Sequence, residues 1–143
     1  MGEVGRGFAR LGGVGIAVAR YVAVTIKRVE DLVCWQLGIE LRDRTVAITD
    51  RQAIARDFKF CTQLREAARS VPANIAEGFG RSPRQFYSYL EIAIGSVQEW
   101  ETRFSDNVIV GTLPWSEYQE MRTLAKRTRV ATIRLAAYLR RRF

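Results

Sequence analysis

The 143-residue sequence contains no histidine, two cysteines and three prolines. Histidine is the commonest general base and the commonest metal ligand, so its absence removes most hydrolytic and metal-dependent active sites. The two cysteines, Cys34 and Cys61, are far apart in the sequence and form no metal-binding motif. We interpret them as two reduced thiols of a cytoplasmic helical protein, with a disulfide between neighbouring helices as the alternative.

The sequence also lacks a long uninterrupted apolar run. The apolar stretch at residues 16–25 is short and is interrupted by Arg20, so we expect no membrane span. The same region lacks the basic start, clean apolar core and cleavage site of a signal peptide. Glycine is frequent among the first fifteen residues. We therefore expect residues 1–25 to be a flexible N-terminal extension and residues 26–143 to form one folded domain.

Residues 70–82, in the middle of the chain, contain strong signals for the end of one helix and the start of the next. Pro72 lacks an N–H group, so it kinks a helix or ends it, and we favour a kink followed by a further turn. Gly78 can then close the helix in the left-handed conformation. Ser82 and Gln85 have the spacing of a capping box, which predicts the N-terminus of the next helix.

The polar residues of this corner have two interpretations. In the structural one, Asn74 bonds backbone groups freed by the kink, and Glu77 pairs with Arg81 or Arg69. In the other, free N–H groups at a glycine-rich corner hold a phosphate. We favour the structural interpretation for this motif corner, which consists of Pro72, Asn74, Glu77, Gly78, Gly80, Arg81 and Ser82.

Apolar residues recur at helical spacing in four segments. The first runs from about residue 27 to 48, and the second begins after a cap at Thr49 or Asp50. The fourth begins with a predicted capping box of Ser116 and Gln119 and runs almost to residue 143. The third has the clearest stripe, in alternating steps of four and three: Phe86, Leu90, Ala93, Val97, Trp100 and Phe104. Such steps predict an all-α fold, an antiparallel up-and-down four-helix bundle with a kinked second helix.

The third helix carries more apolar surface than one bundle needs. A second strip consists of Tyr87, Tyr89, Ile92 and Ile94. Gly95 lies in the middle of the same segment, where glycine costs about 1 kcal/mol relative to alanine. Close approach of another helix would compensate that cost. The excess apolar surface suggests a subunit contact, although a deeply buried central helix would show the same pattern.

These motifs resemble those of a known family, the four-helix-bundle proteins named for the intervening sequences of bacterial 23S ribosomal RNA genes. The resemblance begins at about Lys27 and includes residues 29–37, 63–82 and 92–102. It implies an up-and-down four-helix bundle, a ring-like homopentamer and a link to RNA. Trp100 departs from the pattern, because an aliphatic residue is usual there, and residues 1–25 lie outside it.

The charge of the chain is strongly basic, with 23 Lys and Arg against 15 Asp and Glu and a net charge of +8. Residues 116–143 hold eight basic and two acidic residues, so their net charge is +6. This excess favours contact with a polyanion, and the alternative is a solvated basic face. The candidate nucleic-acid-binding residues are Arg122, Lys126, Arg127, Arg129, Arg134 and Arg141.

The sequence contains few of the residue patterns that form an enzyme active site. Its candidate carboxylates, Glu77, Glu91, Glu99 and Glu101, are scattered, and no nucleophile–base pair can be assembled. We therefore expect no catalytic residues, no metal site and no cofactor. The function we favour is a non-enzymatic, oligomeric bundle that binds RNA or a ribonucleoprotein, largely by backbone charge. The alternative is a protein-interaction scaffold that docks a partner enzyme such as a reverse transcriptase, as related bundles do.

Overall fold

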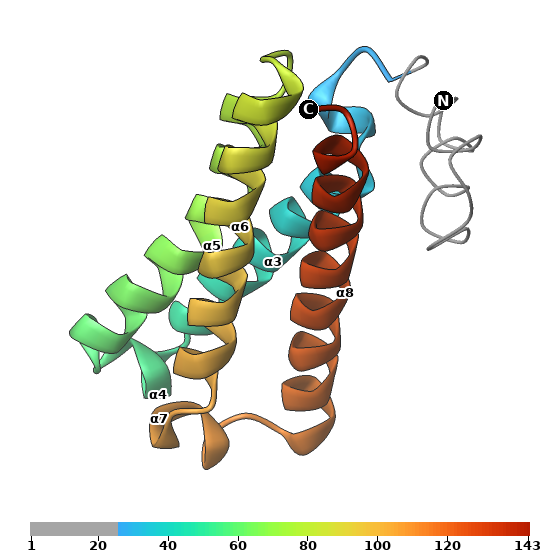
Figure 1. The fold of residues 1–143 in the computed structure, drawn as a ribbon. Coiled ribbons are helices and arrows are strands. Elements are labelled where there is room, and N and C mark those ends of the chain that lie inside the picture. Colours follow the sequence, from blue (N-terminus) through green and yellow to red (C-terminus); the bar gives the residue numbers. More distant parts are fainter. Residues whose placement is uncertain (1–25) are drawn as a thin grey trace.

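The computed structural model describes residues 26–143, and these residues form an all-helical fold (Figure 1). Four helices are long: α3 (Val33–Thr49), α5 (Phe58–Gly78), α6 (Pro83–Phe104) and α8 (Trp115–Arg140). Three further elements are single turns: η1 (Val29–Asp31), α4 (Gln52–Ala55) and α7 (Asn107–Val110). Within residues 26–143, no helix is both long enough and apolar enough to cross a membrane.

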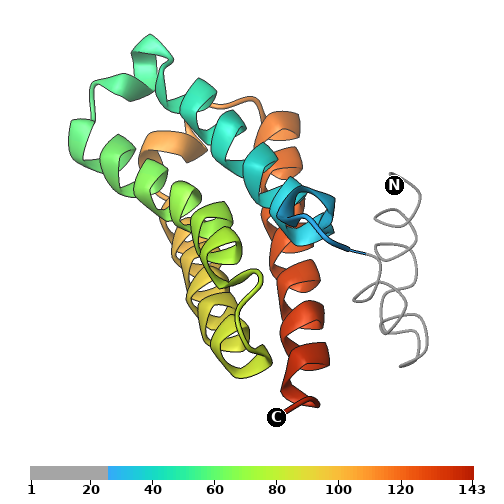
Figure 2. The same ribbon diagram turned by 90° about the horizontal axis from the view of Figure 1, so that it is seen from above.

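Each long helix packs against two others. Helix α5 lies between α3 and α6, and α8 closes the arrangement by packing against both α6 and α3 (Figures 1 and 2). The predicted stripe of α6 forms the centre of the core, and all six of its side chains are buried. Trp100 and Phe104 stack on each other with ring centroids 4.3 Å apart. The apolar seam expected from the sequence is therefore confirmed.

The prediction that Thr49 or Asp50 caps the second long helix is wrong. Thr49 is the last residue of α3, is buried, and donates its hydroxyl to the carbonyl of Thr45. Helix α5 begins at Phe58, where the carboxylate of Asp57 accepts a 3.0 Å hydrogen bond from the N–H of Phe60. A buried hydroxyl bonded within its own helix cannot serve as an N-cap, so Asp57 takes that role.

The first and fourth long helices also begin at other places than predicted. Helix α3 begins at Val33, because the preceding residues form the separate turn η1. Helix α8 begins at Trp115 after Pro114, and no side chain caps it. Ser116 therefore lies inside the first turn, so the predicted capping box of Ser116 and Gln119 is wrong. The fixed φ of a proline suits a helix start without a side-chain cap.

The two glycines of the corner between α5 and α6 have different roles from the predicted ones. Gly78 is the last helical residue of α5, and the left-handed residue is Gly80, with φ 84°. A side chain on Gly78 would bring its Cβ within 2.7 Å of atoms of Phe86 and Tyr89. Gly78 therefore permits close packing of α5 on α6, and Gly80 permits the turn.

Candidate nucleic-acid interface

Three of the candidate basic residues gather at a groove between α3 and α8. Lys126, Arg127 and Arg134 line this groove of about 250 Å³, which we call the α3–α8 groove. Its apolar part is supplied by Val33 and Leu37 of α3 together with Val130 and Ala131 of α8. The three basic side chains belong to exposed residues. The groove thus combines an aliphatic floor with positive charge along α8.

The cations of the α3–α8 groove are not neutralised within the fold. Among residues 26–143, none of Lys126, Arg127 and Arg134 forms an ion pair with a carboxylate. By contrast, both arginines of α3, Arg42 and Arg44, form ion pairs. Three uncompensated charges on one helix repel each other, so an anionic ligand would be bound favourably there.

Arg129 does not belong to this group. It is half-buried, and its Nε donates a 2.8 Å hydrogen bond to Glu101 of α6. Arg129 lies about 60° around the helix from Lys126, and its hydrogen bond to Glu101 shows that its side chain is directed toward α6. The sequence shows equal positive charge at both positions, and only the packing shows that Glu101 compensates one of them.

Arg122 and Arg141 lie apart from the groove. Arg122 donates a 3.1 Å hydrogen bond to the hydroxyl of Tyr118, and its guanidinium lies 5.8 Å from that ring's centroid. Arg141 is the C-cap of α8, at the end of the bundle that also holds the α5–α6 corner (Figure 1). The six candidates therefore divide into a groove set of three and three residues elsewhere on α8.

The motif corner is held by contacts within the chain. The carboxylate of Glu77 accepts a 2.6 Å hydrogen bond from Arg81, which confirms one of the two predicted partners of Glu77. The hydroxyl of Ser82 accepts from the N–H of Gln85, which confirms the predicted capping box. The α5 helix continues through Pro72, which is buried.

Asn74 bonds a different backbone group from the one expected. Its amide donates to the carbonyl of Ser70 at 2.8 Å and to the hydroxyl of Ser70 at 2.9 Å. The hydroxyl of Ser70 lies 2.7 Å from that of Ser96 on α6. The carbonyl that Pro72 leaves without a helical partner belongs to Ala68, so Asn74 does not compensate it. Asn74 instead anchors a hydroxyl pair that joins α5 to α6.

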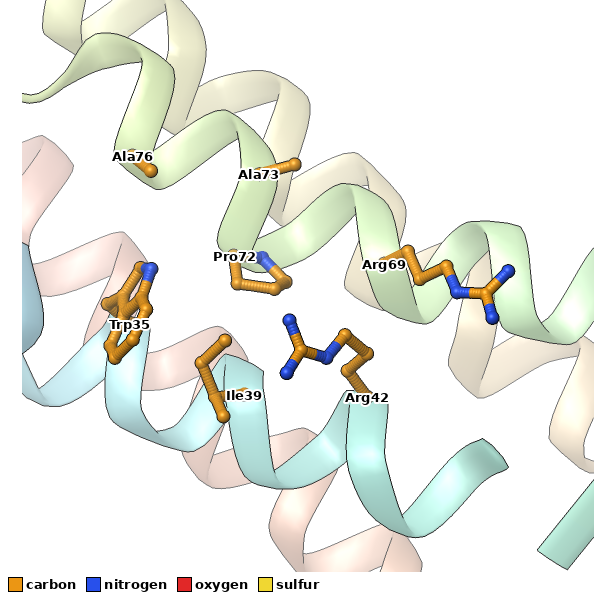
Figure 3. Close-up of a pocket in the computed structure, with 7 residues that line it drawn as sticks. All are labelled: Trp35, Ile39, Arg42, Arg69, Pro72, Ala73 and Ala76. Atoms are coloured by element: carbon orange, nitrogen blue, oxygen red, sulfur yellow. The ribbon is translucent and has the colours of Figure 1, made fainter. Parts of the chain in front are cut away.

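A second groove lies on the other side of α3, between α3 and α5 (Figure 3). Trp35 and Ile39 of α3 face Pro72, Ala73 and Ala76 of α5 across it, and its volume is about 440 Å³. Its two charged lining residues are Arg42 and Arg69. Trp35 is only half-buried, so it lies at the edge of the core and presents part of its indole to this α3–α5 groove.

The carboxylates and thiols do not converge on a reactive centre. Glu77, Glu99 and Glu101 each pair with a different arginine, and in residues 26–143 no three His, Cys, Asp or Glu residues are grouped to hold a metal ion. Cys34 and Cys61 are buried free thiols. Burial raises the pKa of Cys34 to about 12 and also raises the pKa of Cys61, which disfavours the reactive thiolate.

Comparison with known proteins identifies the family. No curated protein and no solved structure gives a significant match to the chain. The sequence model described as 23S rRNA-intervening sequence protein matches residues 30–133. This range contains α3, α5 and α6 in full and α8 up to residue 133. The match covers well over half of the sequence. The chain therefore belongs to the 23S rRNA-intervening sequence protein family.

Proposed function

We propose that the protein binds RNA through the α3–α8 groove, as a non-enzymatic, up-and-down helical bundle of the cytoplasm. The observation that carries the proposal is the uncompensated charge of Lys126, Arg127 and Arg134. Backbone phosphates are the ligands that such a cluster favours, because each neutralised phosphate releases a condensed counterion. The family's relation to ribosomal RNA supports RNA as the polyanion.

The lining of the groove indicates how RNA would be held. Its apolar residues, Val33, Leu37, Val130 and Ala131, are aliphatic, so the groove provides no aromatic ring on which a base could stack. Its charged groups are long and flexible. We therefore expect recognition of backbone charge and RNA shape there, with little discrimination between sequences.

Assembly into a homo-oligomer, most simply a pentameric ring, is part of the proposal. Ile92 on α6 is 51% exposed, and a Cβ built on Gly95 would meet no atom within 4 Å among the described residues. The protomer therefore gives no packing reason for a glycine in the middle of α6. Contact with a second copy at this face would supply one, and a ring would repeat the α3–α8 groove around its circumference.

The test is RNA binding measured over a range of salt concentrations. Replacing both Arg127 and Arg134 by Gln should weaken all RNAs alike and lower the salt dependence of log affinity by about 0.7–0.9 per lost phosphate contact. The matched control replaces Arg56 and Lys59, two exposed cations of the α4–α5 region, by Gln. Equal losses in both double variants would show that net charge, and not the groove, determines binding.

The α3–α5 groove favours a second candidate function, a scaffold that docks a partner enzyme. A half-exposed Trp35 beside Pro72 offers an apolar anchor point. Arg69 would attract an acidic partner segment, whereas Arg42 is already paired with Asp43. This alternative replaces the RNA proposal if the parent protein shows no salt-dependent RNA binding. Trp35→Ala should then abolish capture of the partner while leaving the oligomer intact.

A further inference from the structure

The α5–α6 corner and the last turn of α8 lie at the same end of the molecule (Figure 1). Arginine side chains from these segments lie over aromatic rings. We call this surface the arginine–aromatic end. Four pairs form it, with guanidinium-to-centroid distances of 4.3 to 5.8 Å: Arg81 on Tyr89, Arg84 on Phe143, Arg140 on Tyr87 and Arg142 on Tyr138.

This density of cation–π pairs is far above the ordinary level. Proteins contain roughly one significant pair per 70–80 residues. Residues 26–143 contain five such pairs, and four of them share this end. The concentration therefore requires an explanation specific to this surface.

Three of the four arginines keep their charge uncompensated. Among the described residues, Arg84, Arg140 and Arg142 form no ion pair with a carboxylate, whereas Arg81 pairs with Glu77. Arg140 also donates a 3.1 Å hydrogen bond to the hydroxyl of Tyr87. The guanidinium groups are thus positioned by rings, which leaves their remaining N–H groups available to an anion.

Two of the four rings contact each other. Tyr87 and Phe143 meet edge to face, with centroids 5.4 Å apart and an interplanar angle of 63°. Phe143 is 46% exposed, although an apolar ring of this size is favourably buried. A positioned, exposed ring beside uncompensated arginines is the arrangement that binds single-stranded nucleic acid, because every base has a face that stacks.

We propose that the arginine–aromatic end binds unpaired nucleotides, with a base stacked on Phe143 and phosphates contacted by Arg84, Arg140 and Arg142. The inference rests on the proposed RNA-binding function and extends it to a second surface with a preference for unpaired over duplex RNA. An acidic protein would use the charge but not the exposed ring. A membrane would require several protruding apolar side chains, and Phe143 is the only one of these rings that is exposed.

The experiment compares binding of a fluorescent single-stranded RNA of about twelve nucleotides with binding of the same RNA in a duplex. Phe143→Ala should weaken the single strand at least about fivefold, the lower limit for loss of one base–aromatic stack, and leave its salt dependence unchanged. Duplex binding should not change. Phe58→Ala is the matched control, because Phe58 is 78% exposed at the first residue of α5, at the other end of that helix.

The outcomes separate this inference from the proposed function. The inference fails, and the proposed function stands, if single-stranded and duplex RNA bind equally well and Phe143→Ala changes neither affinity, while the Arg127 and Arg134 double variant lowers both. Absence of any RNA binding by the parent would overturn both. Polyglutamate and vesicles containing an anionic lipid should compete less well than unlabelled single-stranded RNA. If either competes equally well, the surface recognises negative charge alone, and the inference is overturned.

Discussion

The indole N–H of Trp100 donates a 3.0 Å hydrogen bond to the hydroxyl of Thr45, which joins α6 to α3 inside the core. Both residues are at most 1% exposed. Thr45 in turn donates to the carbonyl of Leu41, one turn earlier in its own helix. The polar atom that a tryptophan brings into the core is thus satisfied by a hydroxyl from another helix, 55 positions away in the sequence.

Thr45→Val should destabilise the protein by about 1–3 kcal/mol, because it leaves the buried indole N–H without an acceptor. Urea unfolding measures the effect. Thr102→Val is the matched control, since Thr102 also bonds a carbonyl of its own helix but is exposed. An equal loss of stability in both variants would show that the hydrogen bond to Trp100 adds nothing.

The two glycines at Gly78 and Gly95 should respond to substitution in opposite ways. Gly78→Ala should destabilise the protein by about 1–3 kcal/mol, because its Cβ would lie 2.7 Å from atoms of Phe86 and Tyr89. Gly95→Ala should stabilise the isolated protomer by about 1 kcal/mol, because alanine favours helix and its Cβ meets no atom. Thermal or urea unfolding of dilute protein measures both.

Gly95 also provides the test of assembly. Gly95→Leu should leave the protomer folded and reduce the size of the oligomer, because leucine would prevent close approach of a second copy at this face of α6. Light scattering combined with gel filtration measures the change. A parent that is monomeric at micromolar concentration would contradict the assembly proposal, and an unchanged oligomer in Gly95→Leu would place the interface elsewhere.

Asn74→Ala should lower the free energy of unfolding by about 1–2 kcal/mol, because the amide makes two hydrogen bonds to Ser70. Gln98→Ala is a suitable control, as Gln98 is exposed on the neighbouring helix α6. If the midpoint of urea unfolding does not change, Asn74 has no structural role, and its effect on RNA binding should be measured instead.

The ion pair between Arg51 and Glu117 should make stability depend on pH. Its hydrogen bonds with Arg51 lower the pKa of Glu117 below the ordinary value of 4.5. Because the pKa of Glu117 is lower in the folded than in the unfolded state, the ion pair stabilises the protein fully above about pH 4.5. This stabilisation is lost as the pH falls through the folded-state pKa.

Glu117→Gln should therefore be less stable than the parent at pH 7, by about 1 kcal/mol or less, because the pair lies at the surface and its arginine is exposed. The difference should shrink as the pH falls below 4.5. Glu91→Gln provides the comparison, because Glu91 is exposed and has no ion pair among the described residues. A parent–variant difference that does not vary between pH 3 and pH 7 would contradict the assignment.

The parts of the fold that the sequence predicted are those governed by periodicity and local capping. The α6 stripe and the capping box at Ser82 depend on residues within a turn or two of each other, and both are confirmed. Helix starts at Thr49 and Ser116 were wrong because several residues nearby could serve as caps. At the first of these places Thr49 is buried in α3 and Asp57 caps α5 instead, and at the second no side chain caps α8.

In the candidate interface too, the sequence predicted what depends on one helix and missed what depends on contacts between helices. The sequence locates the positive charge on the fourth helix, but it cannot show that Glu101 neutralises Arg129 from a helix 28 residues earlier. It also missed the contribution of Val33 and Leu37 to the α3–α8 groove, because only the packing of α3 on α8 brings them beside the basic residues. The arginine–aromatic end was missed because it joins two short stretches, residues 81–89 and 138–143, that only the fold brings together.

The tight connection between α5 and α6 has a consequence for the order of folding. Only four residues separate these helices, and they include the left-handed Gly80 and the capped Ser82. Closing so short a loop costs little chain entropy, whereas α3 and α8 must meet across most of the polypeptide. We therefore expect the α5–α6 hairpin to be structured in the transition state. Substitutions at its corner would slow refolding, and substitutions between α3 and α8 would mainly accelerate unfolding.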